Sequence, residues 1–99
     1  MNSELLVKTL SECAALLRRS GDDFWSAKME QVAARGSGSS FYGEKEVLGW
    51  FGGMGSLNDV LLSNVNGYTV SDAEEDAVNA EFRRLTSIIY QQAKQLARE

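Results

Sequence analysis

The last third of the chain carries an apolar pattern that leaves few choices of fold. From Ser71 onward, apolar side chains recur at spacings of three and four residues over five turns. This spacing places them on one face of an α-helix, and that face has to be buried against other elements. No proline interrupts the pattern, because the chain contains none. We predict a long helix from Ser71 to about Ala97, with an apolar stripe formed by Val78, Phe82, Leu85, Ile89, Ala93 and Leu96.

The preceding residues supply further amphipathic segments for that stripe to pack against. Gly36 to Ser40 form a Gly/Ser-rich connection that is too short to separate two domains. We therefore predict a single helical domain over residues 1–99, an all-α bundle of four or five helices with a long C-terminal helix. The shorter helices are predicted at 2–20, 22–35, 43–51 and from Ser56 onward, where Ser56 with Asp59 forms a capping box, as Ser71 does with Glu74.

Composition places the chain among globular proteins. Hydrophobic residues make up 43% and charged residues 24% of its 99 positions, which is too apolar for a disordered chain. No window approaches 18 consecutive apolar residues, so we expect no membrane span. The start, Met1 to Glu4, lacks the basic and apolar regions of a secretory signal. The single cysteine, Cys13, lies on the apolar face of the first helix, which favours a buried, reduced thiol and a cytoplasmic location.

The negative charge is concentrated in the middle of the chain. Residues 46–82 contain seven Asp and Glu residues and no Lys or Arg, within a net charge of −4. An acidic region repels nucleic acid and anionic lipid and can attract a basic protein, so we expect neither nucleic acid nor a membrane as a partner. The alternative interpretation is a solvated face that keeps a small protein soluble.

The residue types present in the chain are poorly suited to catalysis. The chain has no histidine, which excludes histidine-based triads and most zinc sites. One cysteine cannot form a thiolate cluster, and the paired carboxylates fall at helix starts, where capping explains them. We predict no enzymatic activity, no metal site and no cofactor.

A glycine-rich segment, Trp50-Phe51-Gly52-Gly53-Met54-Gly55-Ser56, interrupts the helical pattern. Because glycine destabilises a helix, this concentration indicates a tight turn between two apolar segments. The segment lacks both the lysine of a phosphate-binding loop and a strand before it. We interpret it as a structural turn.

Two tyrosines fall in predicted loops beside the acidic region. Tyr42 precedes the third helix and Tyr68 follows the fourth. An exposed tyrosine near charged residues is typical of a binding anchor. The alternative is that both rings fold back over the ends of the bundle.

The run Gly49-Trp50-Phe51-Gly52-Gly53-Met54-Gly55-Ser56-Leu57-Asn58-Asp59 resembles the central motif of a family of small uncharacterised bacterial proteins. The surroundings of Tyr42 and Gly43 and the long C-terminal helix are similar to that family as well. The resemblance carries no activity and no functional residue with it. By analogy, proteins of this size and kind often look like immunity proteins of bacterial toxin systems, such as contact-dependent growth inhibition.

These observations favour a small acidic protein-binding module. The leading hypothesis is an immunity protein that neutralises a cognate basic toxin by direct binding, because an acidic face steers association with a cationic protein. The alternative is a homo-oligomeric structural or adaptor protein that pairs through its C-terminal helix as a homodimer. The predicted partner-binding residues are Tyr42, Tyr68, Asp72, Glu75, Asp76 and Glu81.

Overall fold

The computed structural model describes residues 3–36, 43–52 and 55–98, which form four α-helices and two 3₁₀ turns. Within these residues there is no β-strand. The prediction of an all-α bundle with a long C-terminal helix is therefore confirmed. The elements are α1 Glu4–Arg19, α2 Phe24–Ala33, α3 Glu44–Leu48, η2 Leu57–Asp59, η3 Asn64–Asn66 and α4 Glu75–Arg98.

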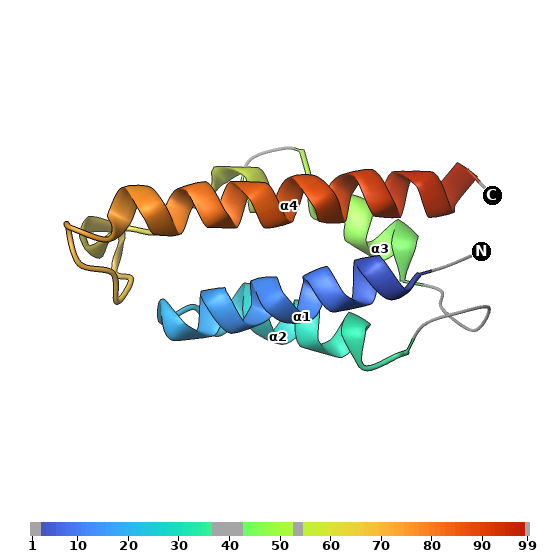
Figure 1. The fold of residues 1–99 in the computed structure, drawn as a ribbon, viewed down its shortest axis with the longest axis horizontal. Coiled ribbons are helices and arrows are strands. Elements are labelled where there is room, and N and C mark those ends of the chain that lie inside the picture. Colours follow the sequence, from blue (N-terminus) through green and yellow to red (C-terminus); the bar gives the residue numbers. More distant parts are fainter. Residues whose placement is uncertain (1–2, 37–42, 53–54, 99) are drawn as a thin grey trace.

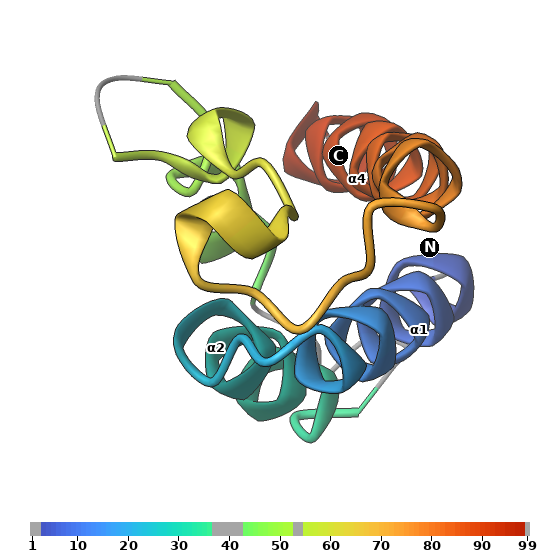
Figure 2. The ribbon, with the colours of Figure 1, turned by 90° about the vertical axis from the view of Figure 1, so that its left-hand side faces the viewer.

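The helices lie around a shared core. Helix α2 folds back against α1, and α4 runs along α1 over most of the length of the molecule (Figure 1). Viewed end-on, α1, α2 and α4 take three sides of the core, and the segment that contains η2 and η3 lies on the fourth (Figure 2). The 24 residues of α4 span about 36 Å at 1.5 Å per residue, which accounts for most of the 42 Å long axis.

The core confirms the apolar stripe predicted for the last helix. Its side chains are buried, apart from the half-buried Val78 at its start, and they join the apolar face of α1 in one cluster. Full burial of an aliphatic side chain contributes about 1.5–3 kcal/mol, so this interface is a main source of stability. None of the helices that the structure describes is both long and apolar enough to cross a membrane. The buried stripe residues are Phe82, Leu85, Ile89, Ala93 and Leu96, and their partners on α1 include Leu6, Leu10, Cys13 and Leu17.

The lone thiol lies in this core, as predicted. Cys13 is buried and forms no disulfide. Burial, together with the negative charges of Asp22 and Glu81, raises the pKa of the Cys13 thiol from 9.0 to about 12. The thiol is therefore neutral at physiological pH and serves as a small apolar side chain.

Helix α1 ends in a turn that contains Gly21, at φ +90°. The Gly21 N–H donates to the Arg18 carbonyl and the Asp22 N–H to that of Leu17, which is the Schellman arrangement that ends many helices. The Asp22 carboxylate accepts a hydrogen bond from the Trp25 N–H at 2.7 Å, so it caps α2 as predicted.

The prediction of a fourth helix after Ser56 is wrong. The segment makes only the short turn η2, and Val60 is already extended, with φ −73° and ψ 125°. In this extended segment Leu61 is exposed and the neighbouring Leu62 is buried. Asn79 of α4 binds the backbone of Leu62, which favours an extended segment over a further helical turn.

Three smaller differences concern helix ends and one side chain. Helix α3 ends at Leu48, three residues before the predicted end, and the chain then turns toward the glycine segment. Helix α4 begins at Glu75, although the predicted contact between Ser71 and Glu74 forms one turn earlier, with Ser71 Oγ 2.8 Å from Glu74 Oε1. Phe24, an apolar residue of the helix predicted at 22–35, is 64% exposed because it occupies the first position of α2, outside the core.

Candidate functional site

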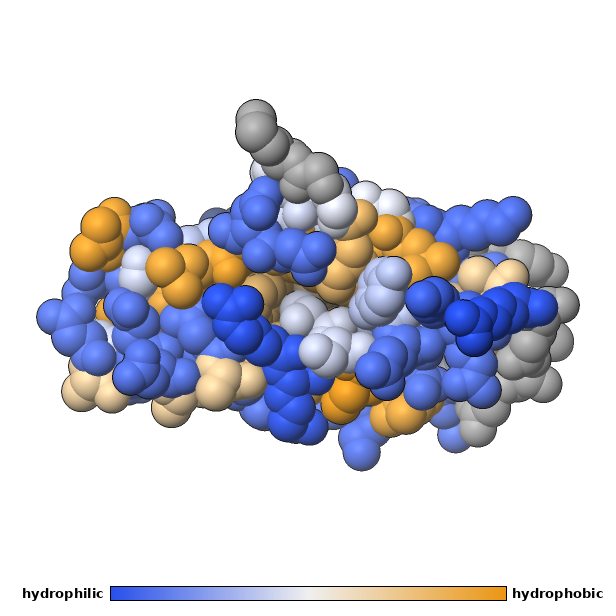
Figure 3. Space-filling model, turned by 90° about the horizontal axis from the view of Figure 1, so that it is seen from above, coloured by the Kyte–Doolittle hydropathy of each residue, from blue (hydrophilic) through white to orange (hydrophobic). Residues whose placement is uncertain are grey.

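The end of the molecule formed by η3 and the start of α4 carries both exposed apolar side chains and several carboxylates. Val65, at the tip of η3, is 89% exposed, and Leu61 is 43% exposed. Figure 2 looks onto this end, and in Figure 3 apolar atoms at the left-hand side lie among hydrophilic ones. We refer to the surface formed by Leu61, Val65, Asp72, Glu75 and Asp76 as the acidic end.

Hydrogen bonds hold the two parts of the acidic end together. The Asn64 side-chain amide donates to the Asp72 carboxylate at 2.8 Å, which joins η3 to the segment before α4. Within the loop, the Asn66 side chain donates to the Leu61 carbonyl at 3.1 Å, and the backbone N–H of Asn66 donates to Ser63 Oγ. Because these contacts are local and numerous, the exposed side chains are held on a defined scaffold.

The acidic residues predicted to bind a partner fall into two groups. Asp72, Glu75 and Asp76 lie at the start of α4, and within the described residues none of them forms an ion pair. Glu81 lies further along α4, where its carboxylate accepts two hydrogen bonds from Arg84, at 2.7 and 2.9 Å. This contact with Arg84 lowers the pKa of Glu81 and compensates its charge. The structure therefore gathers three of the four predicted carboxylates and sets Glu81 apart from them.

The two predicted tyrosine anchors have different outcomes. Tyr42 lies outside the described residues. Tyr68 is half-buried, and its hydroxyl donates to the buried Asp22 carboxylate at 3.4 Å. Burial, followed by the nearby Asp22 charge, raises the pKa of Tyr68. This contact links the loop after η3 to the start of α2, so Tyr68 has a structural role beside any role in binding.

The glycine segment forms a tight turn, as its composition predicts. Gly52 and Gly55 have φ values of +97° and +73°, in the left-handed region that favours glycine. The Leu57 N–H donates to the Trp50 carbonyl at 2.8 Å and brings the two sides of the turn together. The Asp59 carboxylate accepts from the N–H of Ser56 at 3.3 Å as part of the predicted capping box, and it also accepts from the N–H of Gly55 at 2.8 Å. Gly53 and Met54 lie outside the described residues.

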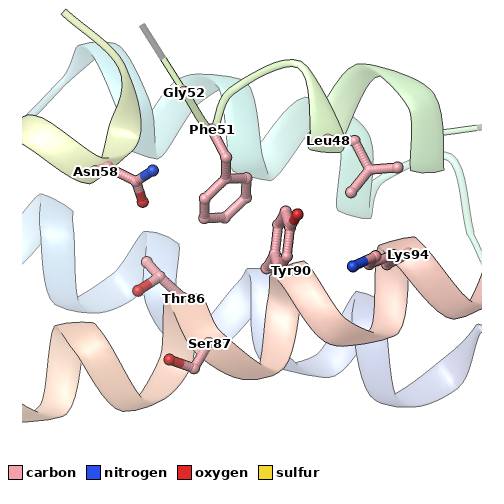
Figure 4. Close-up of a pocket in the computed structure, with 8 residues that line it drawn as sticks. All are labelled: Leu48, Phe51, Gly52, Asn58, Thr86, Ser87, Tyr90 and Lys94. Atoms are coloured by element: carbon pink, nitrogen blue, oxygen red, sulfur yellow. The ribbon is translucent and has the colours of Figure 1, made fainter. Parts of the chain in front are cut away.

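A crevice opens between this turn and α4 (Figure 4). Its volume is about 530 Å³, within the range of small-molecule pockets. The Phe51 and Tyr90 rings meet edge to face across it, with their centroids 5.0 Å apart. The Lys94 ammonium group lies 5.6 Å from the centre of the Tyr90 ring. The α3–α4 crevice, as we call it, is lined by Leu48, Phe51, Gly52, Asn58, Thr86, Ser87, Tyr90 and Lys94.

Comparison with known proteins identifies a family. The family described as "Domain of unknown function (DUF6966)" matches residues 18–71, just over half of the chain. The chain belongs to this family. No curated protein and no solved structure matches it.

The DUF6966 segment runs from the end of α1 through η3 and stops before α4. It therefore contains the glycine turn, Leu61 and Val65, whereas the carboxylates of the acidic end follow it in the chain. The α3–α4 crevice is divided in the same way, since four of its lining residues belong to the DUF6966 segment and the other four to α4. Both candidate sites thus lie where the family segment meets the C-terminal helix.

Proposed function

We propose that this DUF6966 protein is a protein-binding module, and specifically an immunity protein that neutralises a cognate basic toxin by docking its acidic end onto it. The observation that carries the proposal is the 89% exposure of Val65 on a structured turn beside three carboxylates that form no ion pair within the described residues. An apolar centre with a charged rim is the usual anatomy of a protein-binding patch.

The charge of the acidic end selects the kind of partner. Asp72, Glu75 and Asp76 lie within five residues of one another, and Glu74 adds a fourth carboxylate. Their position at the start of α4 also stabilises the helix, because the helix dipole is positive there. The carboxylates stay at the surface while they do so, and they would steer a cationic protein toward Val65.

The described residues of α4 leave little exposed apolar surface through which two chains could pair as a homodimer. The stripe on α4 that would pair two chains is buried in the core of one chain. On the remaining faces of α4, Ile88 is half-buried and Tyr90 is 37% exposed. The acidic end, in contrast, offers Val65 with almost its whole side chain in solvent. We therefore place the partner at the acidic end.

Co-expression with the neighbouring reading frame tests the proposal. The expected result is rescue of growth from a toxic product and co-purification of the two proteins. Glu75→Gln with Asp76→Asn should slow association several-fold at low salt, and Val65→Asp should weaken the complex about tenfold or more. A neighbouring frame without a toxic product, or a pair that does not co-purify, would contradict the proposal.

Glu12→Gln with Glu44→Gln is the matched control for charge. It also removes two negative charges, but from α1 and α3, away from the acidic end. Equal slowing by both double variants would indicate a general effect of net charge, and the acidic end would then not be the docking surface.

A further inference from the structure

The α3–α4 crevice differs in charge from the rest of this acidic molecule. Among the described residues its lining contains one cation, Lys94, and no carboxylate, although the chain carries 14 acidic and 10 basic residues. It lies roughly 15 Å along α4 from Asp76, as the ten residues to Thr86 indicate. In Figure 3 the hollow midway along this face shows apolar and weakly polar atoms. An anionic ligand is thus favoured here and disfavoured at the acidic end.

Several polar groups of the crevice are available to a ligand. Within the described residues, the side chains of Asn58 and Ser87 and the Tyr90 hydroxyl make no hydrogen bond, while Thr86 Oγ1 donates to the Arg83 carbonyl. In Figure 4 the Asn58 amide points toward Thr86, and the Lys94 ammonium group points toward Tyr90. The Lys94 ammonium group can donate to an anion that lies beside the Tyr90 ring, whereas the Asn58 amide lies on the other side of the two rings (Figure 4).

The other walls of the crevice are apolar and aromatic. Phe51 is half-buried, and its ring lies at 62° to that of Tyr90, so the two rings form a corner. Leu48 flanks this corner from α3 (Figure 4). A flat ring can pack against one of the aromatic faces and meet the edge of the other.

We propose that the α3–α4 crevice binds a carboxylate attached to an aromatic body, with the carboxylate on Lys94 and the ring against Phe51 and Tyr90. Such a group occurs in free aryl acids and at a polypeptide end whose last residue is aromatic. The inference does not rest on the proposed toxin binding, because the crevice and the acidic end share no residue.

Titration of the ¹⁵N-labelled full-length chain tests this site. The probes are 4-hydroxyphenylacetate for a free acid, N-acetylphenylalanine for a polypeptide end, and N-acetylphenylalanine amide, which has the ring without the charge. We expect saturable shifts of the Gly52 N–H and the Asn58 side-chain amide with at least one acid, and none with the amide. The acid that binds more tightly identifies the source of the ligand.

Variants of the lysine decide whether the carboxylate binds where proposed. Lys94→Gln should weaken binding of the acid about tenfold, and Lys94→Arg should retain most of it. Lys28→Gln is the matched control, because Lys28 also lies over aromatic rings, 5.0 Å from the centre of Phe24, but outside the crevice. Tyr90→Ala should abolish the shifts, whereas Tyr90→Phe keeps the ring and should preserve them.

Three results would overturn the assignment. The first is an absence of saturable shifts with either acid at about 10 mM, well above the millimolar affinity expected of so small a ligand. The second is equal binding of the uncharged amide. The third is binding that Lys94→Gln leaves unchanged. Retained dispersion in each variant's own spectrum shows that the variant is folded.

Discussion

The side-chain amide of Asn79 pairs with both backbone groups of Leu62. Its Oδ1 accepts from the Leu62 N–H at 2.9 Å, and its Nδ2 donates to the Leu62 carbonyl at 2.8 Å and to the Glu75 carbonyl at the same distance. Asn79 is buried, with 8% of its surface exposed. This side chain therefore fastens the extended segment after η2 onto α4 much as a neighbouring strand would.

Asn79→Ala should destabilise the fold by about 2 kcal/mol or more, because it leaves both buried backbone groups of Leu62 without a partner. Urea unfolding followed by tryptophan fluorescence measures the change. Gln91→Ala removes an exposed amide from the same helix and should stay within about 0.5 kcal/mol of the parent. Similar losses in the two variants would mean that the Leu62 contact contributes little.

Gly21→Ala should cost more stability than Gly36→Ala. The two glycines have nearly equal φ values, +90° and +87°, so an alanine at either position carries a similar backbone strain of roughly 1–2 kcal/mol. A Cβ on Gly21 would also lie 3.1 Å from Thr69 Oγ1, whereas a Cβ on Gly36 meets no atom of the described residues within 4 Å. Thermal unfolding of the two variants separates the effect of backbone strain from that of the Thr69 contact. Equal losses of stability in the two variants would show that Thr69 moves aside freely.

The Cys13 thiol should resist alkylation in the folded protein. Its raised pKa of about 12 keeps the thiolate scarce at pH 8, and its burial blocks the reagent. We expect mass spectrometry to show no iodoacetamide adduct in buffer and complete labelling in 8 M urea, about the concentration that unfolds most small domains. Rapid labelling in buffer would place the thiol at the surface.

The same shift predicts how stability responds to alkaline pH. A thiol with a raised pKa binds its proton more tightly in the folded state, so its contribution is complete below the ordinary pKa of 9.0 and is lost as pH rises toward about 12. Cys13→Ala should therefore show a shallower fall in melting temperature between pH 9 and pH 11 than the parent chain. Identical slopes would contradict the shift.

Val65→Asp should leave the fold as stable as the parent, within about 0.5 kcal/mol, since 89% of the Val65 side chain is already in solvent. Leu62→Asp, three residues earlier, should unfold the protein because Leu62 is fully buried. Circular dichroism on heating distinguishes the two. A large loss from Val65→Asp would mean that Val65 packs against the chain, and its effect on binding would then carry no information about docking.

The parts of the fold that periodicity predicts are those in which one helix face meets the core. The stripe from Phe82 to Leu96 is such a case, because the spacing of apolar residues is enough to identify the buried side. The segment after Ser56 is different. Its capping box is real, but a side chain 17 residues away decides its conformation, and no local pattern signals that partner.

The candidate sites were predicted unevenly for the same reason. Asp72, Glu75 and Asp76 are neighbours in the sequence, so their grouping follows from the sequence itself. Val65 was missed because a lone valine in a turn looks like any other loop residue. The α3–α4 crevice could not be predicted, since it joins Asn58 and Phe51 to Lys94 from segments more than 30 residues apart. The absence of acids between Arg83 and Arg98 is the one sequence signal that could have indicated it.

Helix α1 begins, and helix α4 finishes, at the extremity of the molecule away from η3 (Figure 1). A protein fused before α1 or after α4 would therefore extend from the end of the molecule opposite Val65. Immobilising the protein through such a fusion would present the tip of η3 to the solution in a uniform orientation. A short bridge between the two adjacent ends would also permit a circularly permuted chain in which every helix keeps its neighbours.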